Sequence, residues 1–379
     1  MRLSLFAISL AFLPLLVAQV PPAAPGRGGR GPQQPAIKFC EIHTDRTVTF
    51  RLRAPEATDV KFSGDFVQGA PPMQKGDDGV WSFTSEPLNP AIYSYNFRVN
   101  GVTVLDPINP AIKQGEVSSS SMFEVPAETP QPYDIQEVPH GTVHENWYQS
   151  KTLGVWRRMD VYTPPGYEAG KSTYPVLYLL HGSGDTESGW VGCGKANLIL
   201  DNLIAASKAK PMIVVMPYGR ARQDVYLGPA GALPADPKAF ENDLLQDVMP
   251  FAEKLYRISA KPASRAIAGL SMGGGQALSV GLHHLDTFHA VGAFSAAGRA
   301  AGMEEQYKDL LADPAATNKR LQVFYIACGK TDSLFAPAQE LHAVLDKHQI
   351  HHTFTPSEEG HVWRNWRNYL AEFVPQLFR

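Results

Sequence analysis

The hydrophobic pattern of the chain changes character along its length. Between residues 37 and 126, short runs alternate apolar with polar residues, as in VTFRLRA (48–54) and GVWSFTS (79–85). Such alternation is typical of strands with one buried face, and the pair Asn100-Gly101 predicts a hairpin turn between two of them. The pattern therefore predicts a small β-sandwich domain over residues 37–126.

Residues 140–379 follow a different pattern, in which continuous apolar runs alternate with amphipathic segments such as 240–256. Apolar runs of this length are typical of strands that are covered on both faces. They are PVLYLLHG (175–182), MIVVMPYG (212–219), RAIAGLS (265–271), HAVGAFSAA (289–297) and LQVFYIACG (321–329). The alternation predicts an α/β fold with a doubly wound, mostly parallel sheet. Since ligands of such sheets bind beyond the carboxyl ends of the strands, candidate chemistry is expected there.

The first 36 residues lack the pattern of a folded domain. Arg2 precedes the apolar run LSLFAISLAFLPLLVA (3–18), which resembles the charged and apolar regions of a secretory signal. We therefore expect a signal peptide over 1–19, a Pro/Gly-rich linker over 20–36, and a secreted or periplasmic protein. The run is short and contains Pro14, which disfavours a membrane span, although an uncleaved anchor stays open. A second proline-rich stretch, 127–139, is predicted to connect the two domains.

Composition narrows the class of protein further. The chain has 379 residues, enough for two domains, and 44% of them are hydrophobic, as in globular proteins. A net charge of -3 without a basic block disfavours a nucleic-acid partner. The three cysteines, Cys40, Cys193 and Cys328, are too few and too scattered for a disulfide framework, so free thiols are expected.

A candidate nucleophile stands at the end of one predicted strand. RAIAGL is followed at once by Gly269-Leu270-Ser271-Met272-Gly273 and then by a helical run. G-x-S-x-G between a buried strand and a helix is typical of a nucleophile elbow, where small neighbours allow the sharp turn that exposes the serine hydroxyl. Ser271 is therefore the predicted nucleophile.

A serine nucleophile needs a base, and the base needs an orienting acid. The predicted base is His361, on a loop between the strand-like run 351–356 and the final helix. The predicted acid is Asp332, which directly follows the strand 321–329. Asp346, Glu358 and Glu359 are the weaker alternatives, because the first reads as a helix-surface residue and the glutamates lie beside the histidine in sequence.

The same scheme predicts two backbone donors for an oxyanion. One is the N–H of Met272, directly after the nucleophile; the other is the N–H of Ser183, in the loop after an early strand. His181 in that loop is expected to be a buried hydrogen-bonding residue. Trp190 and the stretch 220–226 are candidates for substrate contact, although a tryptophan there can equally pack the loop.

The quoted motifs resemble those of known families. MDVYTPPGY (159–167), YPVLYLLHGSGDTESGW (174–190), AGLSMGGGQAL (268–278), CGKTD (328–332) and GHVWRNWRNYLAEFVPQLF (360–378) are similar to the esterase D-like superfamily, especially the feruloyl and acetylxylan esterases of the first carbohydrate esterase family. The resemblance implies an α/β-hydrolase fold and ester hydrolysis by Ser271, Asp332 and His361.

The N-terminal region carries a resemblance of its own. FRLRAP (50–55), GVW (79–81), YSYNF (93–97) and Asp106-Pro107 resemble the immunoglobulin-like, glycogen-binding-type modules that precede glycogen-branching enzymes, isoamylases and some bacterial esterases. In relatives that bind glycans, exposed aromatic residues stack on the sugar. Trp81 is the single tryptophan of this region and lies on an alternating strand, so it is expected to belong to the core.

Together these observations predict a secreted serine esterase that hydrolyses feruloyl or acetyl esters on plant polysaccharides. The same superfamily contains siderophore esterases and acyltransferases, which stay open as alternatives. A non-catalytic glycan-binding protein is the alternative from another class, but it would not need all the predicted site residues. No H-E-x-x-H or paired-cysteine spacing appears and no dinucleotide motif opens the first βα unit, so no catalytic metal or cofactor is expected.

Overall fold

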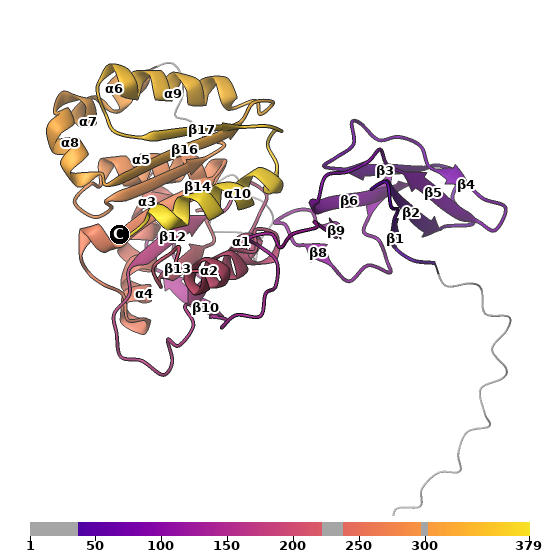
Figure 1. Cartoon of the computed structure of the whole chain (residues 1–379), viewed down its shortest axis with the longest axis horizontal. Helices are drawn as coiled ribbons and strands as arrows, with labels where there is room; N and C mark the ends of the chain where they lie inside the picture. The colour runs from indigo at the N-terminus through magenta and orange to yellow at the C-terminus, as the bar shows by residue number, and fades with distance from the viewer. Residues whose placement is uncertain (1–36, 222–237, 297–301) are drawn as a thin grey trace, which may run out of the picture. The chain divides into compact units, whose positions relative to one another are not determined.

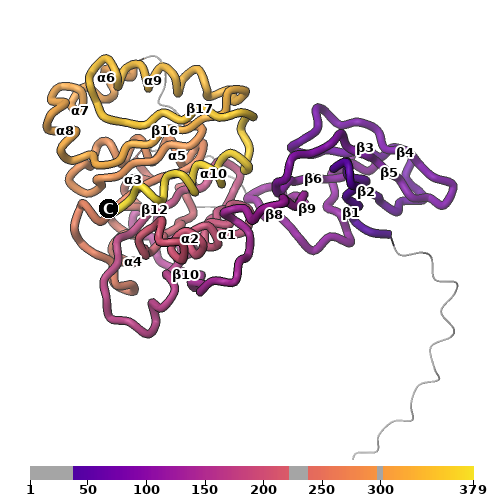
Figure 2. The backbone as a smooth tube through the Cα atoms, in the orientation of Figure 1, coloured from indigo at the N-terminus to yellow at the C-terminus, as the bar shows by residue number. Residues whose placement is uncertain are grey.

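The computed structural model of the chain describes residues 37–221, 238–296 and 302–379, drawn in colour in Figures 1 and 2. The predicted signal peptide and the first linker lie outside the described residues. Residues 38–379 form one compact unit.

Two antiparallel sheets make up the N-terminal part of this unit, as the alternating pattern predicted. The first has the order β1-β2-β5-β4, and the second has the order β3-β6-β9-β8 with β7 paired to β6. Their strands are β1 (Cys40–Ile42), β2 (Val48–Arg53), β3 (Val60–Gly64), β4 (Gln74–Lys75), β5 (Val80–Thr84), β6 (Ala91–Val99), β7 (Val102–Val104), β8 (Ile112–Lys113) and β9 (Ser120–Val125).

An aromatic core joins these two sheets. The rings of Phe50 on β2 and Phe62 on β3 lie 4.6 Å apart, and Tyr95 and Phe123 pack against Phe50. Trp81 is buried with them, and its indole N–H donates to the carbonyl of Ala54. The expectation that Trp81 belongs to the core is therefore confirmed.

The C-terminal part is built on a sheet of eight strands in the order β10-β11-β13-β12-β14-β15-β16-β17. The first two strands form an antiparallel hairpin, and the strands from β13 to β17 are parallel. The strands are β10 (Thr142–Ser150), β11 (Val155–Thr163), β12 (Val176–Leu180), β13 (Ile213–Pro217), β14 (Arg265–Leu270), β15 (Ala290–Phe294), β16 (Val323–Gly329) and β17 (Thr353–Ser357).

Helices cover both faces of this sheet, which explains why the strands read as continuous apolar runs (Figure 1). Alternate residues of β12 point to opposite faces of the sheet. Val176 and Tyr178 belong to the hydrophobic core on one face, and Leu177 and Leu179 belong to the core on the other face. The helices of one face are α1 (Gly189–Gly192), α2 (Ala196–Ala205) and α10 (Trp363–Phe373). Those of the other are α3 (Ala239–Asp243), η1 (Leu244–Val248), α4 (Met249–Leu255), α5 (Met272–His283), α6 (Met303–Gln306), α7 (Lys308–Ala312) and α9 (Phe335–Lys347). α8 (Pro314–Arg320) contacts α7, since Thr317 donates to the Leu310 carbonyl.

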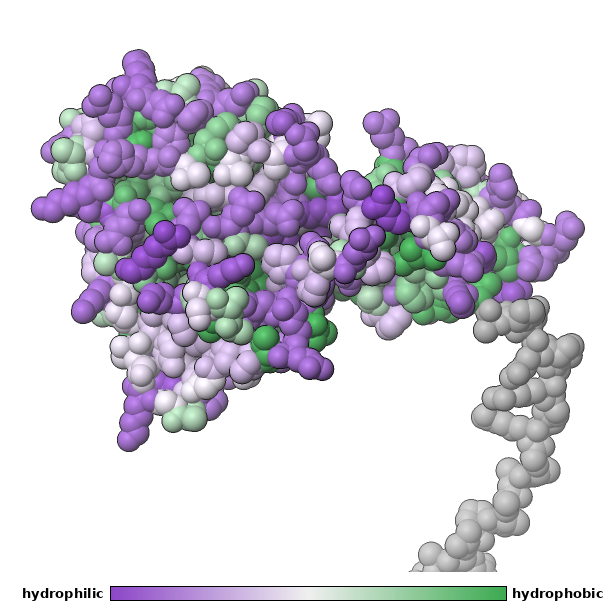
Figure 3. Space-filling model, viewed as in Figure 1, coloured by the Kyte–Doolittle hydropathy of each residue, from purple (hydrophilic) through white to green (hydrophobic). Residues whose placement is uncertain are grey.

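The surface that faces the viewer in Figure 3 is mainly hydrophilic over residues 38–379, with apolar side chains in small groups. Among the described residues, none of the helices has the length and apolar character needed to span a bilayer.

Candidate active site

The loop between β14 and α5 presents Ser271 in a sharply turned backbone. Ser271 has φ 52° and ψ -116°, in a region that L-residues rarely adopt. A Cβ atom on Gly269 would lie 2.5 Å from the Gly273 carbonyl, and one on Gly273 would lie 2.5 Å from the His181 carbonyl. Only glycine fits at either position, so the G-x-S-x-G pattern has the close-packed geometry of a nucleophile elbow.

Ser271, His361 and Asp332 form a continuous chain of hydrogen bonds. Nε2 of His361 lies 2.9 Å from Oγ of Ser271, and its Nδ1 lies 2.8 Å from Oδ2 of Asp332. When the carboxylate is ionised, Nδ1–H donates to it, and Nε2 can accept the serine proton. The structure thus brings together the three residues predicted as nucleophile, base and acid.

Asp332 is held in its ionised form. Its side chain is buried, and burial alone would raise its pKa. Hydrogen bonds from His361, the Leu334 N–H and Ser295 outweigh burial, so the pKa of Asp332 lies below the ordinary value. An acid kept ionised in this way can hold the imidazole in one tautomer and stabilise its protonated form.

Two residues that sequence reasoning missed support this carboxylate. Ser295 follows β15 with φ 46°, is fully buried, and accepts a hydrogen bond of 2.9 Å from the Trp366 indole. The Trp366 ring also packs edge-on against the His361 ring, with centroids 4.9 Å apart. The only signal for Ser295 was its place at the carboxyl end of a predicted strand, and the sequence carried no sign that Trp366 would reach it.

The loop after β12 packs directly against the serine. A Cβ atom on Gly182 would lie 3.4 Å from the Ser271 Cβ, so the backbone that leads into Ser183 passes beside Ser271. His181 is buried: its Nδ1 donates to the Gly182 carbonyl, and its Nε2 accepts from the Gly219 N–H at 2.8 Å. Burial lowers the pKa of His181 to about 4, so the ring is neutral and structural, as expected. This arrangement leaves Met272 and Ser183 on the two segments that flank the serine hydroxyl.

The expectation that Trp190 contacts the substrate is wrong in this structure. Its side chain is fully buried, with the indole N–H donating to the Leu180 carbonyl at 2.9 Å. The ring packs edge-on against Phe294 and Trp363. Trp190 therefore packs the loop, the alternative that its position allowed. The stretch 220–226 was the other candidate for substrate contact, and residues 222–226 of it lie outside the described residues. Arg220, at its start, donates to the Ser183 hydroxyl at 2.8 Å.

The end of β8 and the segment that follows it contact the loop that carries Ser183. The Lys113 ammonium lies 3.1 Å from the buried carboxylate of Asp185, and the Glu116 N–H donates to the Gly184 carbonyl at 2.8 Å. Glu116 also pairs with Arg220 at 3.0 Å. The N-terminal part therefore helps to hold the loop beside Ser271.

A small polar pocket of about 240 Å³ opens beside His361. Its walls combine residues of the N-terminal part with the start of α10. They are Ser63, Gly64, Asp65, Ser94, Tyr95, Asn96, Lys113 and Ser120 on one side and His361, Val362, Trp363 and Trp366 on the other. The many hydroxyl, amide and charged groups suit a ligand that is rich in hydrogen-bonding groups.

The mixed sheet, the elbow and the hydrogen-bonded Ser–His–Asp chain define an α/β-hydrolase-fold protein. Comparison with known families is consistent with that class: the model of the Esterase family matches residues 150–377, and the chain belongs to this family.

Three relatives illustrate the similarity. The chain is 30% identical over 353 residues to the endo-1,4-beta-xylanase/feruloyl esterase of Xylanibacter ruminicola; the match covers 91% of this chain but only 47% of that protein. The ferulic acid esterase of Anaeromyces mucronatus, solved in complex with ferulic acid, is 25% identical with a TM-score of 0.56, and the match covers 66% of this chain and 96% of that one. The enterobactin esterase of Shigella flexneri shares the fold at 21% identity and a TM-score of 0.66, covering 88% of this chain and 92% of that one.

Proposed function

We propose that the protein is a carboxylic ester hydrolase in which Ser271, His361 and Asp332 form the catalytic triad. The observation that carries this proposal is the hydrogen-bonded chain from the Ser271 hydroxyl through His361 to the buried Asp332 carboxylate. Membership of the Esterase family supports the same reaction.

In this mechanism Nε2 of His361 takes the Ser271 proton while Oγ attacks the ester carbonyl. The backbone N–H groups of Met272 and Ser183 stabilise the oxyanion, and the N-terminus of α5 favours the negative charge that develops there. The protonated imidazole then gives its proton to the leaving alcohol. Water attacks the acyl-enzyme with His361 as general base, which restores the free serine.

For the substrate, we propose a feruloyl or acetyl ester carried by a plant polysaccharide or a derived oligosaccharide. The Xylanibacter relative, which combines a xylanase with a feruloyl esterase in its name, and the ferulic acid complex of the Anaeromyces enzyme support this choice. The polar pocket beside His361 suits a hydroxyl-rich alcohol such as a sugar. Such polymers lie outside cells, which agrees with our proposal that residues 1–19 direct export.

The test is hydrolysis of a panel of matched esters by the purified chain. The panel holds feruloylated and acetylated xylo-oligosaccharides, methyl ferulate and a catecholate-siderophore ester, each with Ser271→Ala as the control. We expect a higher kcat/KM for a sugar ester than for methyl ferulate, with both rates lost in the variant. Preference for the siderophore ester would overturn the substrate proposal but not the triad, whereas a rate retained by Ser271→Ala would overturn the triad.

Hydrolysis and acyl transfer differ only in the molecule that attacks the acyl-enzyme. Adding an excess of free xylo-oligosaccharide to the feruloyl ester assay separates them. We expect free ferulate as the main product; a dominant new sugar ester would identify an acyltransferase instead.

A further inference from the structure

We propose that His342, Asp346 and His352 form a zinc-binding site, separate from the Ser271 site. His342 and Asp346 lie one turn apart on α9, and His352 directly precedes β17. One ligand atom from each residue can be chosen so that all three lie within 4.8 Å of one another. Two imidazoles and one carboxylate are a donor set that Zn²⁺ commonly takes.

The separations of the ligand atoms are close to those of a metal site. Nδ1 of His342 lies 2.7 Å from Nε2 of His352. Oδ1 of Asp346 lies 3.9 Å from the same His352 nitrogen, while the other carboxylate oxygen lies 3.5 Å from the second ring nitrogen of His342, Nε2. Since each histidine gives one nitrogen to an ion, the limit of 4.8 Å describes the set as a whole. Bonds of about 2.0–2.1 Å round a tetrahedral zinc ion place ligand atoms about 3.3 Å apart. To admit the ion, the two histidines need to separate by about half an ångström and the Asp346 carboxylate needs to move toward them, and both shifts can be made by the partly exposed α9 side chains of His342 and Asp346.

His352 is oriented as a metal ligand before any ion binds. Its Nδ1–H donates to the Ile350 carbonyl at 2.8 Å, so the lone pair is on Nε2, which points at His342 and Asp346. Only 2% of its side chain is exposed, so the ring cannot easily turn away. A backbone carbonyl bound to the second ring nitrogen is the usual partner of a zinc-ligating histidine.

The His342 ring is also held in place by an aromatic neighbour. It stacks on Phe354 of β17, with centroids 4.8 Å apart and planes 20° apart. Its Nδ1 is hydrogen-bonded to Nε2 of His352 at 2.7 Å, so the stacked ring already presents this nitrogen to the other histidine of the cluster.

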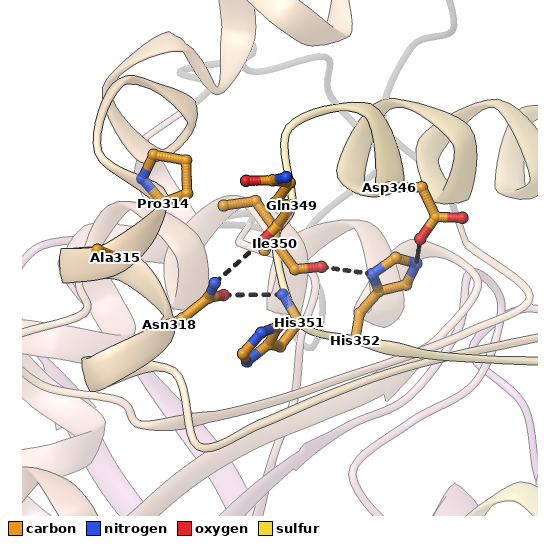
Figure 4. A pocket seen from close by; sticks show the side chains of 8 residues that line it. All are labelled: Pro314, Ala315, Asn318, Asp346, Gln349, Ile350, His351 and His352. Atoms are coloured by element: carbon orange, nitrogen blue, oxygen red, sulfur yellow. Dashed lines mark hydrogen bonds and ion pairs between the residues drawn. The ribbon is translucent and has the colours of Figure 1, made fainter.

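Space for the remaining ligand lies next to the cluster. A hollow of about 590 Å³ is lined by Asp346, His351 and His352 together with Pro314, Asn318 and Gln349. Figure 4 shows the Asp346 and His352 side chains pointing toward each other at one side of this hollow. Water can therefore reach the open position that three protein ligands leave on a tetrahedral ion.

The position of the cluster suggests what the ion does. α9 follows the loop that carries Asp332, and β17 leads into the loop that carries His361. An ion bound by α9 and by the residue before β17 links these two elements at a distance from the reacting atoms. We therefore expect zinc to stabilise the fold and to leave the ester reaction unchanged at moderate temperature.

The experiment is zinc binding to the full purified chain, produced without a polyhistidine tag, stripped with EDTA and desalted. Titration calorimetry with ZnCl₂ is combined with the visible spectrum of the Co²⁺-loaded protein, which reports tetrahedral coordination. We expect one equivalent of Zn²⁺ at micromolar affinity or tighter, a rise in Tm of several degrees, and no comparable effect of Mg²⁺ or Ca²⁺, which prefer all-oxygen sites.

Variants assign the ion to these residues. His342→Ala and Asp346→Asn should bind Zn²⁺ at least tenfold more weakly and lose the Tm rise, and both change partly exposed side chains that the fold can spare. His351→Ala is the matched control for a neighbouring exposed histidine, and His361→Ala excludes an ion at the ester site; both should bind like the parent. Absence of binding at 100-fold excess, or unchanged affinity in His342→Ala and Asp346→Asn, would overturn the site.

Discussion

Nε2 of His361 lies 2.9 Å from Oγ of Ser271, although 90 positions separate the two residues in the chain. Three parallel strands lie between their elements in sequence, and the carboxyl ends of all of them meet at the same edge of the sheet. The contact is possible because Ser271 adopts a backbone conformation that glycine neighbours alone allow. Chemistry at this site therefore depends on the sheet order as much as on the three side chains.

Replacing Ser271 by alanine should lower kcat by about 10⁴-fold or more, because the members of the proposed triad act as a unit and the remaining groups provide only residual catalysis. Steady-state and single-turnover assays on methyl ferulate measure the loss. Tm should stay within a few degrees of the parent value, which separates lost chemistry from lost folding. A decrease below tenfold would contradict the role of Ser271.

Asp332→Asn should reduce kcat by about 10³–10⁴-fold, since the amide favours the wrong imidazole tautomer. It should also change the pH dependence of stability. The pKa of Asp332 is lowered in the folded state, so its ionised form stabilises the protein above the ordinary carboxyl pKa, near 4, and this contribution is lost as pH falls through the lower folded-state value.

Urea unfolding of Asp332→Asn and the parent between pH 3 and 7 measures this contribution. We expect the variant to be less stable at pH 7 by about 1–3 kcal/mol, with the difference shrinking below pH 4. A difference that grows as the pH falls would contradict the direction of the shift.

Ser295 and Trp366 should act as positioning residues. Ser295→Ala removes a hydrogen bond to the Asp332 carboxylate, and Trp366→Phe removes the indole donor to Ser295 while keeping an aromatic ring against His361. We expect kcat to fall about tenfold in Ser295→Ala, as a lost charge-assisted hydrogen bond implies. KM should change little.

Trp366→Phe should show a smaller loss than Ser295→Ala, because its effect passes through the serine. The double variant checks this order: if the two residues act through one hydrogen-bond chain, its loss should be no larger than that of Ser295→Ala. Fully multiplicative losses would show that they act separately.

Lys113 should matter for the loop beside the nucleophile. Burial raises the pKa of Asp185, and the Lys113 ammonium is the main charge that opposes this rise. Lys113→Met leaves a buried carboxylate without its cation, so we expect a stability loss of about 1–3 kcal/mol and a fall in kcat/KM. Lys61→Met, at an exposed ion pair 4.0 Å long, is the matched control and should be nearly neutral.

The cysteines should resist modification in the native protein. All three are free; burial raises the pKa of Cys40 and Cys193 to about 11 and that of Cys328 to about 12. Thiolate, the reactive form, is therefore scarce at pH 8. Ellman's reagent should react slowly with the folded protein and should label three thiols after unfolding. Rapid reaction of one thiol per molecule in the native state would contradict this prediction.

The sequence predicted the elbow, the base and the acid because each follows a strand whose apolar run is easy to recognise. The residues that support them could not be found in that way. Trp366 and Ser295 meet across 71 positions, and their contact depends on how α10 crosses the sheet. Trp190 was misassigned for the same reason: a loop tryptophan is buried or open according to its tertiary neighbours, here Trp363 and Phe294.

The contact between Lys113 and Asp185 has a consequence for how such a protein can evolve. A recombination event that removed residues 37–126 would delete the cation of a buried carboxylate and the Glu116 donor to Gly184. The remaining C-terminal part would keep a buried carboxylate without its cation, in the loop that packs against Ser271. In related genes, the two parts should therefore be gained or lost together, unless a substitution at Asp185 removed the charge first.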